Sequence, residues 1–250
     1  MKLTHSRYLV DLWCARASAC EPGVLEQCCE ASLRDDERLH ADRFRRPTTR
    51  NQHVVGRGMA RTLLASSDVA PQDIEFSFNA HGKPDVVGPA KAKRPFNIAH
   101  TEGMVVFASC EIGQIGVDVE RLTRSTNIDI AHRYFAKPEV DFVISHREDE
   151  ERRLAFLKVW TLKESFIKAI GMGLAIPLAD FAFIDIDSPN PRVQILNASL
   201  GDASMWRFAT TSPADGYIAS IAIADHPSTA PLRINVRDFE TLINSSMKEA

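Results

Sequence analysis

The sequence lacks an apolar run long enough to cross a bilayer, which takes about 20 consecutive apolar residues. Near its start, Arg7 and Asp11 interrupt the stretch that a secretory signal would need to keep apolar. Cysteine is scarce: there are five residues, an odd number, and none shows the C-x-x-C spacing of zinc sites or thioredoxin-type redox centres. We therefore expect a cytoplasmic protein with reduced thiols and no membrane partner.

The motifs of several common enzyme classes are also missing. Walker A, H-E-x-x-H and G-x-S-x-G patterns do not occur, and Gly56-Arg57-Gly58 lies in a helical pattern rather than after a strand, which argues against a dinucleotide site. A net charge of −3 gives no general basic footprint for nucleic acid. The exception is residues 43–61, with six arginines and no acidic residue. This run is either a solvated basic face or a phosphate-binding edge, and arginine without lysine favours bidentate anion recognition.

The chain contains enough apolar residues, 44%, to form one large domain or two lobes. Periodicity predicts helices at 22–41, at 48–65, and from 125 to the terminating Gly171 and Gly173, with a break near Pro138. The predicted strands are 8–15, 74–79, 95–100, 104–109, 115–120, 181–187, 192–196, 205–211 and 217–224. Strands 104–109 and 115–120 are expected to form a hairpin. Each half runs from helices to strands, which indicates an α+β fold with lobes at 1–112 and 113–250.

Two carboxylates alternate with valines in the segment GVDVE at 116–120. On a strand, Asp118 and Glu120 point to the same face, with Cα atoms about 7 Å apart. That spacing suits one hard cation, but it is also typical of an ordinary polar strand face.

The helix around residues 154–170 carries a second group of polar residues. Trp160, Glu164 and Lys168 follow one another at i, i+4 and i+8 on the flank of its apolar side. Glu164 and Lys168 form either a surface ion pair or part of a partly buried site beside Trp160. Lys163 falls within the apolar side, so it must reach solvent or meet a buried anion. In residues 97–103, His100 and Thr101 end a strand at a turn, where a phosphate can bind, although a lone histidine is more often structural.

These segments together resemble the large, monomeric, surfactin-synthetase-activating type of 4′-phosphopantetheinyl transferase. FNIAHT at 96–101 is similar to F-N-x-S-H-S, and GVDVE at 116–120 is similar to G-[IV]-D-[IV]-E. WTLKESFIK at 160–168 matches W-x-x-K-E-[AS]-x-x-K at every fixed position. Order and spacing agree too, as does Gly82-Lys83-Pro84, and the resemblance covers residues 35–185.

The resemblance implies an enzyme that transfers the phosphopantetheine arm of coenzyme A to a serine of an acyl or peptidyl carrier protein and releases adenosine 3′,5′-bisphosphate. It implies two pseudo-symmetric α+β lobes, each with helices on a small antiparallel sheet, and an active site in the cleft between them. Mg²⁺ would be held by Asp118, Glu120 and Glu164. The implied catalytic residues are Glu164 as proton acceptor, directly or through a metal-bound water, Lys168 at the leaving phosphate, and His100. The implied coenzyme A contacts are Arg57, Gly82, Lys83, Ala99, His100, Thr101, Lys163 and Lys168.

One departure from the family pattern is Ala99, which stands where the family has a serine and removes a hydroxyl donor. After the carboxylate strand, basic residues flank aromatic ones, which indicates either a transient carrier-protein surface or a solvated helix whose aromatic residues face the core. These are Arg121, Arg124, Arg133, Tyr134, Phe135 and Lys137. The alternatives are a non-catalytic coenzyme A or carrier-protein binding module and a different Mg²⁺-dependent phosphotransferase.

Overall fold

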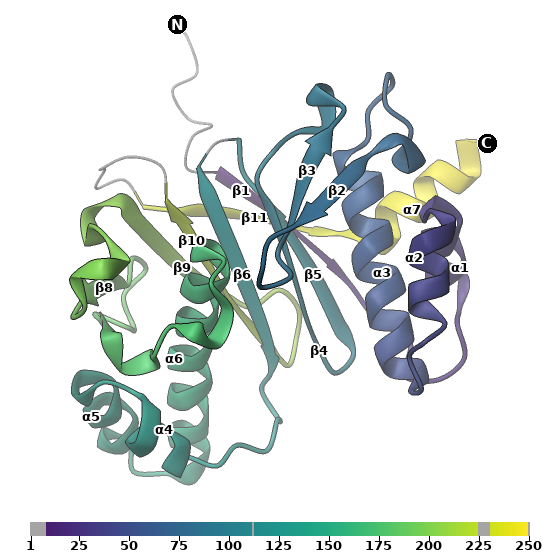
Figure 1. Cartoon of the computed structure of the whole chain (residues 1–250). Helices are drawn as coiled ribbons and strands as arrows, with labels where there is room; N and C mark the ends of the chain where they lie inside the picture. Colours follow the sequence, from purple (N-terminus) through teal and green to yellow (C-terminus); the bar gives the residue numbers. More distant parts are fainter. Residues whose placement is uncertain (1–8, 112, 225–230, 250) are drawn as a thin grey trace, which may run out of the picture.

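The computed structural model describes residues 9–111, 113–224 and 231–249 (Figure 1). Its first sheet has the strand order β11-β1-β5-β4, and its second has the order β6-β10-β9. The strands of these sheets are β1 (Leu9–Ala15), β4 (Phe96–Thr101), β5 (Met104–Ser109), β6 (Gln114–Arg121), β9 (Trp206–Thr211), β10 (Tyr217–Ala224) and β11 (Arg233–Asp238). Two separate hairpins are formed by β2 (Glu75–Phe78) with β3 (Pro84–Gly88) and by β7 (Phe181–Ile184) with β8 (Arg192–Ile195).

Helices cover each sheet on its outer side (Figure 1). The first sheet is covered by α3 (Pro47–Leu64) and α7 (Phe239–Glu249), with α1 (Val24–Ser32) and α2 (Asp35–Ala41) packed on α3. The second sheet is covered by α6 (Asp149–Ile170), with α4 (Asp129–Tyr134) and α5 (Lys137–Ser145) beside it. Short 3-10 turns occur at Pro71–Asp73, Ala90–Ala92, Gly173–Ala175, Leu178–Asp180, Ala198–Leu200 and Ala203–Met205. The α+β prediction is confirmed, with α3 and α6 as the long helices of the two lobes.

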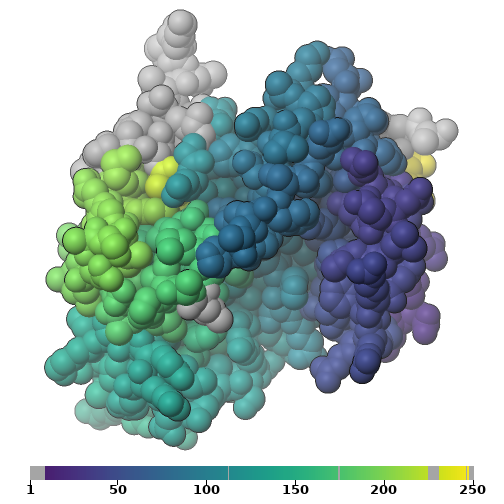
Figure 2. Space-filling view, viewed as in Figure 1, coloured from purple at the N-terminus to yellow at the C-terminus, as the bar shows by residue number. Residues whose placement is uncertain are grey.

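Buried apolar side chains form three clusters. One lies between α3 and the first sheet, around Met59 and Phe107, and another lies between α6 and the second sheet, around Phe166 and Phe208. The third joins the two sheets and includes Val106 of β5 and Val117 of β6. The lobes therefore share a core, while Figure 2 shows the surface hollowed between α1–α3 and α4–α6, below the β2–β3 hairpin.

Several predicted elements need correction. The hairpin of 104–109 with 115–120 is wrong, because β5 pairs with β1 and β4 whereas β6 pairs with β10. The helix predicted over 22–41 is two helices, since the chain is extended at Leu33 and Arg34. Strand β3, which pairs with β2, was not predicted. The end of the long helix is confirmed: Gly171 adopts φ 79°, the left-handed conformation that glycine tolerates best.

The C-terminal segment returns to the first lobe. Strand β11 pairs with β1 in parallel, so the first sheet is not purely antiparallel as expected, and α7 packs beside α1. The proposed boundary between 112 and 113 separates the two sheets, with β11 and α7 as the exception. Within the described residues, no helix is both long and apolar enough to cross a membrane.

Candidate active site

The centre of the site is the strand β6, on which Asp118 and Glu120 are both buried with 6% exposure. Helix α6 packs directly against this strand at Gly116. A Cβ atom at Gly116 would overlap the carbonyl oxygen of Ser165 and the backbone nitrogen of Ala169. Glycine is thus required for the close approach that brings the polar flank of α6 to the carboxylates.

Helix α6 contributes Glu164 and Lys168, both partly buried. The Lys168 Nζ atom donates to Asp118 Oδ1 at 2.6 Å. Burial is the main cause that raises the pKa of Asp118, Glu120 and Glu164, and the charge of Asp118 raises the pKa of the other two further. Lys168 and Arg124 act in the opposite direction on all three groups. The three predicted carboxylates therefore form one electrostatically coupled cluster.

Two further side chains hold Glu120. Arg124 forms an ion pair with Glu120 Oε1, and its guanidinium carbon lies 5.8 Å from the ring centroid of Trp160. The Thr101 hydroxyl donates to Glu120 Oε2 at 3.0 Å. Thr101 was predicted to contact coenzyme A, and the structure shows it orienting a carboxylate.

The cluster fits a divalent cation by its chemistry. Asp118 Oδ2 is buried and has no hydrogen-bond partner among the described residues, and carboxylate oxygens are ligands that Mg²⁺ prefers. In their present geometry, the described residues include no group of three His, Cys, Asp or Glu side chains that converges on one metal position. The carboxylates instead face Lys168 and Arg124.

His100 lies at the exposed end of β4. Its pKa is lowered, first by displacement of water around the ring and then by the charge of Lys168, while Asp118 acts in the opposite sense. Lys168 and Asp118 are thus the charged groups of the cluster that act on the imidazole. Ala99, on the other face of β4, is buried with 3% exposure in the core between the sheets, so it offers a ligand only its backbone.

Arg57, in the 43–61 run, is partly buried and keeps an unused donor. Its guanidinium lies over Phe78 at 4.7 Å and over Phe76 at 5.6 Å, and burial lowers its pKa. The Arg57 Nη1 atom is buried and has no hydrogen-bond partner among the described residues. An anion bound here would satisfy that donor.

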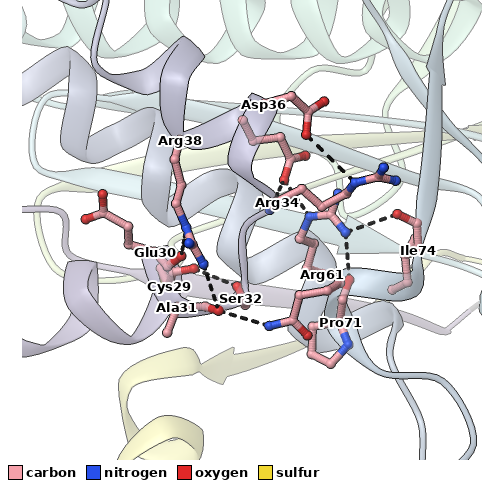
Figure 3. Close-up of polar contacts among 12 residues, drawn as sticks. Cys29, Glu30, Ala31, Ser32, Arg34, Asp36, Arg38, Arg61, Pro71 and Ile74 are labelled. Carbon is pink, nitrogen blue, oxygen red and sulfur yellow. Dashed lines mark hydrogen bonds and ion pairs between the residues drawn. The ribbon is translucent and has the colours of Figure 1, made fainter.

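Other arginines of the run serve the fold. Arg61 is 2% exposed, pairs with Glu37 at 2.6 Å, and donates to the carbonyl oxygens of Pro71 and Ile74 (Figure 3). Arg50 pairs with Glu30 at 2.7 Å and with Asp42 at 2.9 Å. The phosphate-binding edge predicted for the whole run is therefore reduced to Arg57 and the exposed arginines at its start.

Lys83 connects the two lobes. Its Nζ donates to the carbonyl oxygens of Ile115 in β6 and Ala169 in α6, both at 2.9 Å, and burial lowers its pKa to about 8. Lys83 also lines a cavity of about 510 Å³ together with Lys93 and Arg94. Its neighbour Gly82 occupies an open turn with φ 80°.

The expected coenzyme A contact from Lys163 is wrong. Lys163 is fully buried and pairs with the equally buried Glu139 at 2.8 Å. Its Nζ also donates to the carbonyl oxygens of Leu178 and Phe181. The anion that the sequence required for Lys163 is thus Glu139, which no motif indicated; a glutamate at the third position of α5, where it caps the helix, is the signal that was available.

Comparisons with known proteins show which family the chain belongs to. A family model described as the 4′-phosphopantetheinyl transferase superfamily matches residues 114–222, which include the β6 carboxylates and the polar residues of α6. The 4′-phosphopantetheinyl transferase HetI of Nostoc sp. is 31% identical over 219 residues, covering 86% of this chain and 87% of that protein.

Two other relatives show the same similarity. A putative 4′-phosphopantetheinyl transferase of Synechocystis sp. is 32% identical and covers 72% of each chain. The 4′-phosphopantetheinyl transferase Sfp of Bacillus subtilis is 31% identical, covering 59% of this chain and 64% of that protein. The chain therefore belongs to the 4′-phosphopantetheinyl transferase superfamily, the enzyme class that its three motifs predict.

Proposed function

We propose that this enzyme transfers the 4′-phosphopantetheine arm of coenzyme A to a serine hydroxyl of an apo carrier protein, with Mg²⁺ as cofactor. Membership of the superfamily supports the transfer to carrier proteins. The observation that carries the finer proposal is the buried cluster of Asp118, Glu120 and Glu164, which has Lys168 beside it and an unpartnered oxygen on Asp118.

The cluster supplies the ligands that this chemistry needs. Asp118, Glu120 and Glu164 would hold the cation, with pyrophosphate oxygens completing its coordination. When bound, Mg²⁺ offsets the negative charge of the pyrophosphate and of the transition state.

Proton transfer falls to Glu164. Glu164 is a partly buried carboxylate one helical turn before Lys168 on the same face of α6, which supports its role as the proton acceptor. The serine oxygen forms a bond to the phosphorus that carries the pantetheine arm, and its proton passes to Glu164. The pyrophosphate bond breaks, and adenosine 3′,5′-bisphosphate leaves with Lys168 beside its phosphate.

The nucleotide end of coenzyme A would bind toward the first lobe. Arg57 offers an unused guanidinium nitrogen beside two phenylalanine rings, and His100 lies at the end of β4 in the first lobe. Lys83 and Gly82, at the tip of the β2–β3 hairpin, are assigned to the same end.

The carrier protein would dock at the basic segment after β6. Arg121 and Arg124 are 43% and 46% exposed, although each now faces a glutamate of this chain. Tyr134 is 47% exposed and lies under Arg133, whereas Phe135 is buried in the core. An acidic carrier suits this segment, and we propose that the enzyme acts as a cytoplasmic monomer.

A mass measurement tests the function. Incubation of the protein with coenzyme A, Mg²⁺ and an apo carrier protein should add the mass of one phosphopantetheine arm to the carrier, and excess EDTA should prevent the addition. A carrier of unchanged mass would leave the binding-module alternative as the better account.

A further inference from the structure

One face of β4 packs against β6. Asn97, Ala99 and Thr101 alternate along the strand, so their side chains share one face. Asn97 Oδ1 accepts from the Val117 backbone N–H at 2.9 Å, and Thr101 donates to Glu120. Ala99 lies between these two contacts in the core shared with Val117.

Asn97 provides a side-chain hydrogen bond between β4 and β6, where the described residues form no β-ladder of backbone hydrogen bonds. β4 is the edge of the first sheet and β6 is the edge of the second, and no ladder joins the two strands in the described part of the chain. The Val117 N–H is therefore satisfied by a side chain, and Asn97 is itself buried with 5% exposure. A buried N–H without this acceptor would be left unpaired, which native structures avoid.

The position of Val117 makes this contact relevant to the site. It lies between Gly116, where α6 meets β6, and Asp118. A shift of the strand at Val117 would change the position of the Asp118 carboxylate relative to Lys168 and Glu164. Thr101 acts in the same way at the other end, because it orients the Glu120 carboxylate.

We propose that Asn97 and Thr101 are positioning residues that hold the strand β6, and with it Asp118 and Glu120, in place for binding a divalent cation. This inference rests on the proposed function, since it takes Asp118 and Glu120 as ligands of a divalent cation. It differs from the expectation that the 96–101 segment contacts coenzyme A only. Residues that orient metal ligands by hydrogen bonds commonly change metal affinity when they are substituted.

The test measures metal binding without turnover. Mn²⁺ affinity of the protein is measured by electron paramagnetic resonance, and exchange of the Val117 amide is followed by NMR. Asn97→Leu, which has a similar size and no acceptor, should weaken Mn²⁺ binding about tenfold and accelerate Val117 exchange. Asn97→Asp keeps an acceptor oxygen and should bind Mn²⁺ at least as tightly as the wild-type protein. Thr101→Val removes only the hydroxyl donor and should weaken Mn²⁺ binding to a similar degree. This variant tests the proposal even if Asn97→Leu does not fold.

Ile98→Val is the matched control, because Ile98 lies on the opposite face of β4 and packs against the α3 core. It should leave Mn²⁺ affinity unchanged. The inference is overturned if folded Asn97→Leu and Thr101→Val both bind Mn²⁺ within twofold of wild type, if Ile98→Val loses as much affinity as they do, or if the wild-type protein binds no Mn²⁺. A wild-type protein that binds Mn²⁺ but transfers no arm would contradict the proposed function and leave the positioning role intact.

Discussion

Lys168 donates to Asp118 across 2.6 Å, from the end of the long helix α6 to the centre of the strand β6. The two residues are 50 positions apart in the chain and belong to different sequence motifs. Their contact depends on Gly116, which allows the helix backbone to touch the strand. The packing of a single helix on a single strand thus brings the carboxylates and the Lys168 ammonium group of the proposed site together.

Removal of one carboxylate charge should abolish most of the activity. Asp118→Asn and Glu164→Gln keep the size of each side chain but remove negative charge where the bound metal supplies much of the stabilisation. We expect each variant to transfer the arm at least about 10²-fold more slowly, measured as initial rate at saturating Mg²⁺. Unchanged circular dichroism would show that the fold is retained. Near-wild-type rates in both variants would contradict the metal assignment.

Gly116→Ala should separate the helix from the strand. The added methyl group would meet backbone atoms of Ser165 and Ala169, which cannot move as a side chain can. We expect a loss of about 1–3 kcal/mol in the free energy of unfolding, measured by urea titration. Gly201→Ala is the comparison for transfer, because Gly201 lies outside the site and a Cβ there meets no atom within 4 Å, although its φ of 86° adds strain. A Gly116→Ala protein as stable and active as wild type would show that the close approach is not needed.

The Lys163–Glu139 pair should contribute to stability and not to substrate binding. Lys163→Met leaves Glu139 as an unpaired buried carboxylate, which costs about 3–5 kcal/mol. The double variant Lys163→Met/Glu139→Leu removes both charges and should recover much of that loss. The KM for coenzyme A should equal that of wild type in the double variant. An increase in KM there, with stability recovered, would return Lys163 to the coenzyme A site.

The 3′-phosphate of coenzyme A should be recognised by Arg57 and His100. Each charge-assisted hydrogen bond contributes about 1.5–3 kcal/mol, so wild type should prefer coenzyme A over 3′-dephospho-coenzyme A by at least about tenfold in kcat/KM. Arg57→Ala and His100→Ala should each reduce that preference, mainly through KM. Arg50→Ala is the matched control, since Arg50 is occupied by Glu30 and Asp42. If both variants keep the wild-type ratio, the nucleotide end binds elsewhere.

Carrier-protein docking should depend on salt and on Arg124. Higher ionic strength should raise KM for the carrier more than KM for coenzyme A, because exposed charges are screened. Arg133 lies outside the carboxylate cluster, so Arg133→Glu should raise KM for the carrier and leave KM for coenzyme A unchanged. Arg124→Glu should raise carrier KM and also perturb Mg²⁺ dependence, because Arg124 is paired with Glu120. Carrier KM values that match wild type in both variants would place docking on another face, with the exposed arginines at 43–46 the next candidates.

The sequence was sufficient where a feature depends on local pattern. The α+β class, helix α3, and the termination of α6 at Gly171 follow from periodicity and from glycine. The grouping of the three carboxylates was also predictable. Asp118 and Glu120 share one face of a strand, Glu164 lies on the flank of a helix, and the resemblance to the family places both motifs in one site.

Other features depend on contacts that a local pattern does not contain. Strand β5 forms its hairpin with the preceding strand β4 and pairs on its other side with the distant β1, while β6 pairs with the distant β10, so the prediction of a β5–β6 hairpin failed. The partner of Lys163 is Glu139, on a different helix, and no spacing rule links them. The motif around Asn97 does not indicate its role as an acceptor, because that role depends on the packing of β4 against β6.

The central claim is that the pyrophosphate bond of coenzyme A is broken and the arm is joined to a carrier serine. Phosphorus-31 NMR of coenzyme A with the protein, Mg²⁺ and an apo carrier follows this directly. The account predicts that the pyrophosphate signals disappear while a carrier phosphodiester and adenosine 3′,5′-bisphosphate grow in equal amounts, and that Glu164→Gln slows all of these changes together. Pyrophosphate signals that persist in the presence of the wild-type protein and an apo carrier known to accept the arm would contradict it.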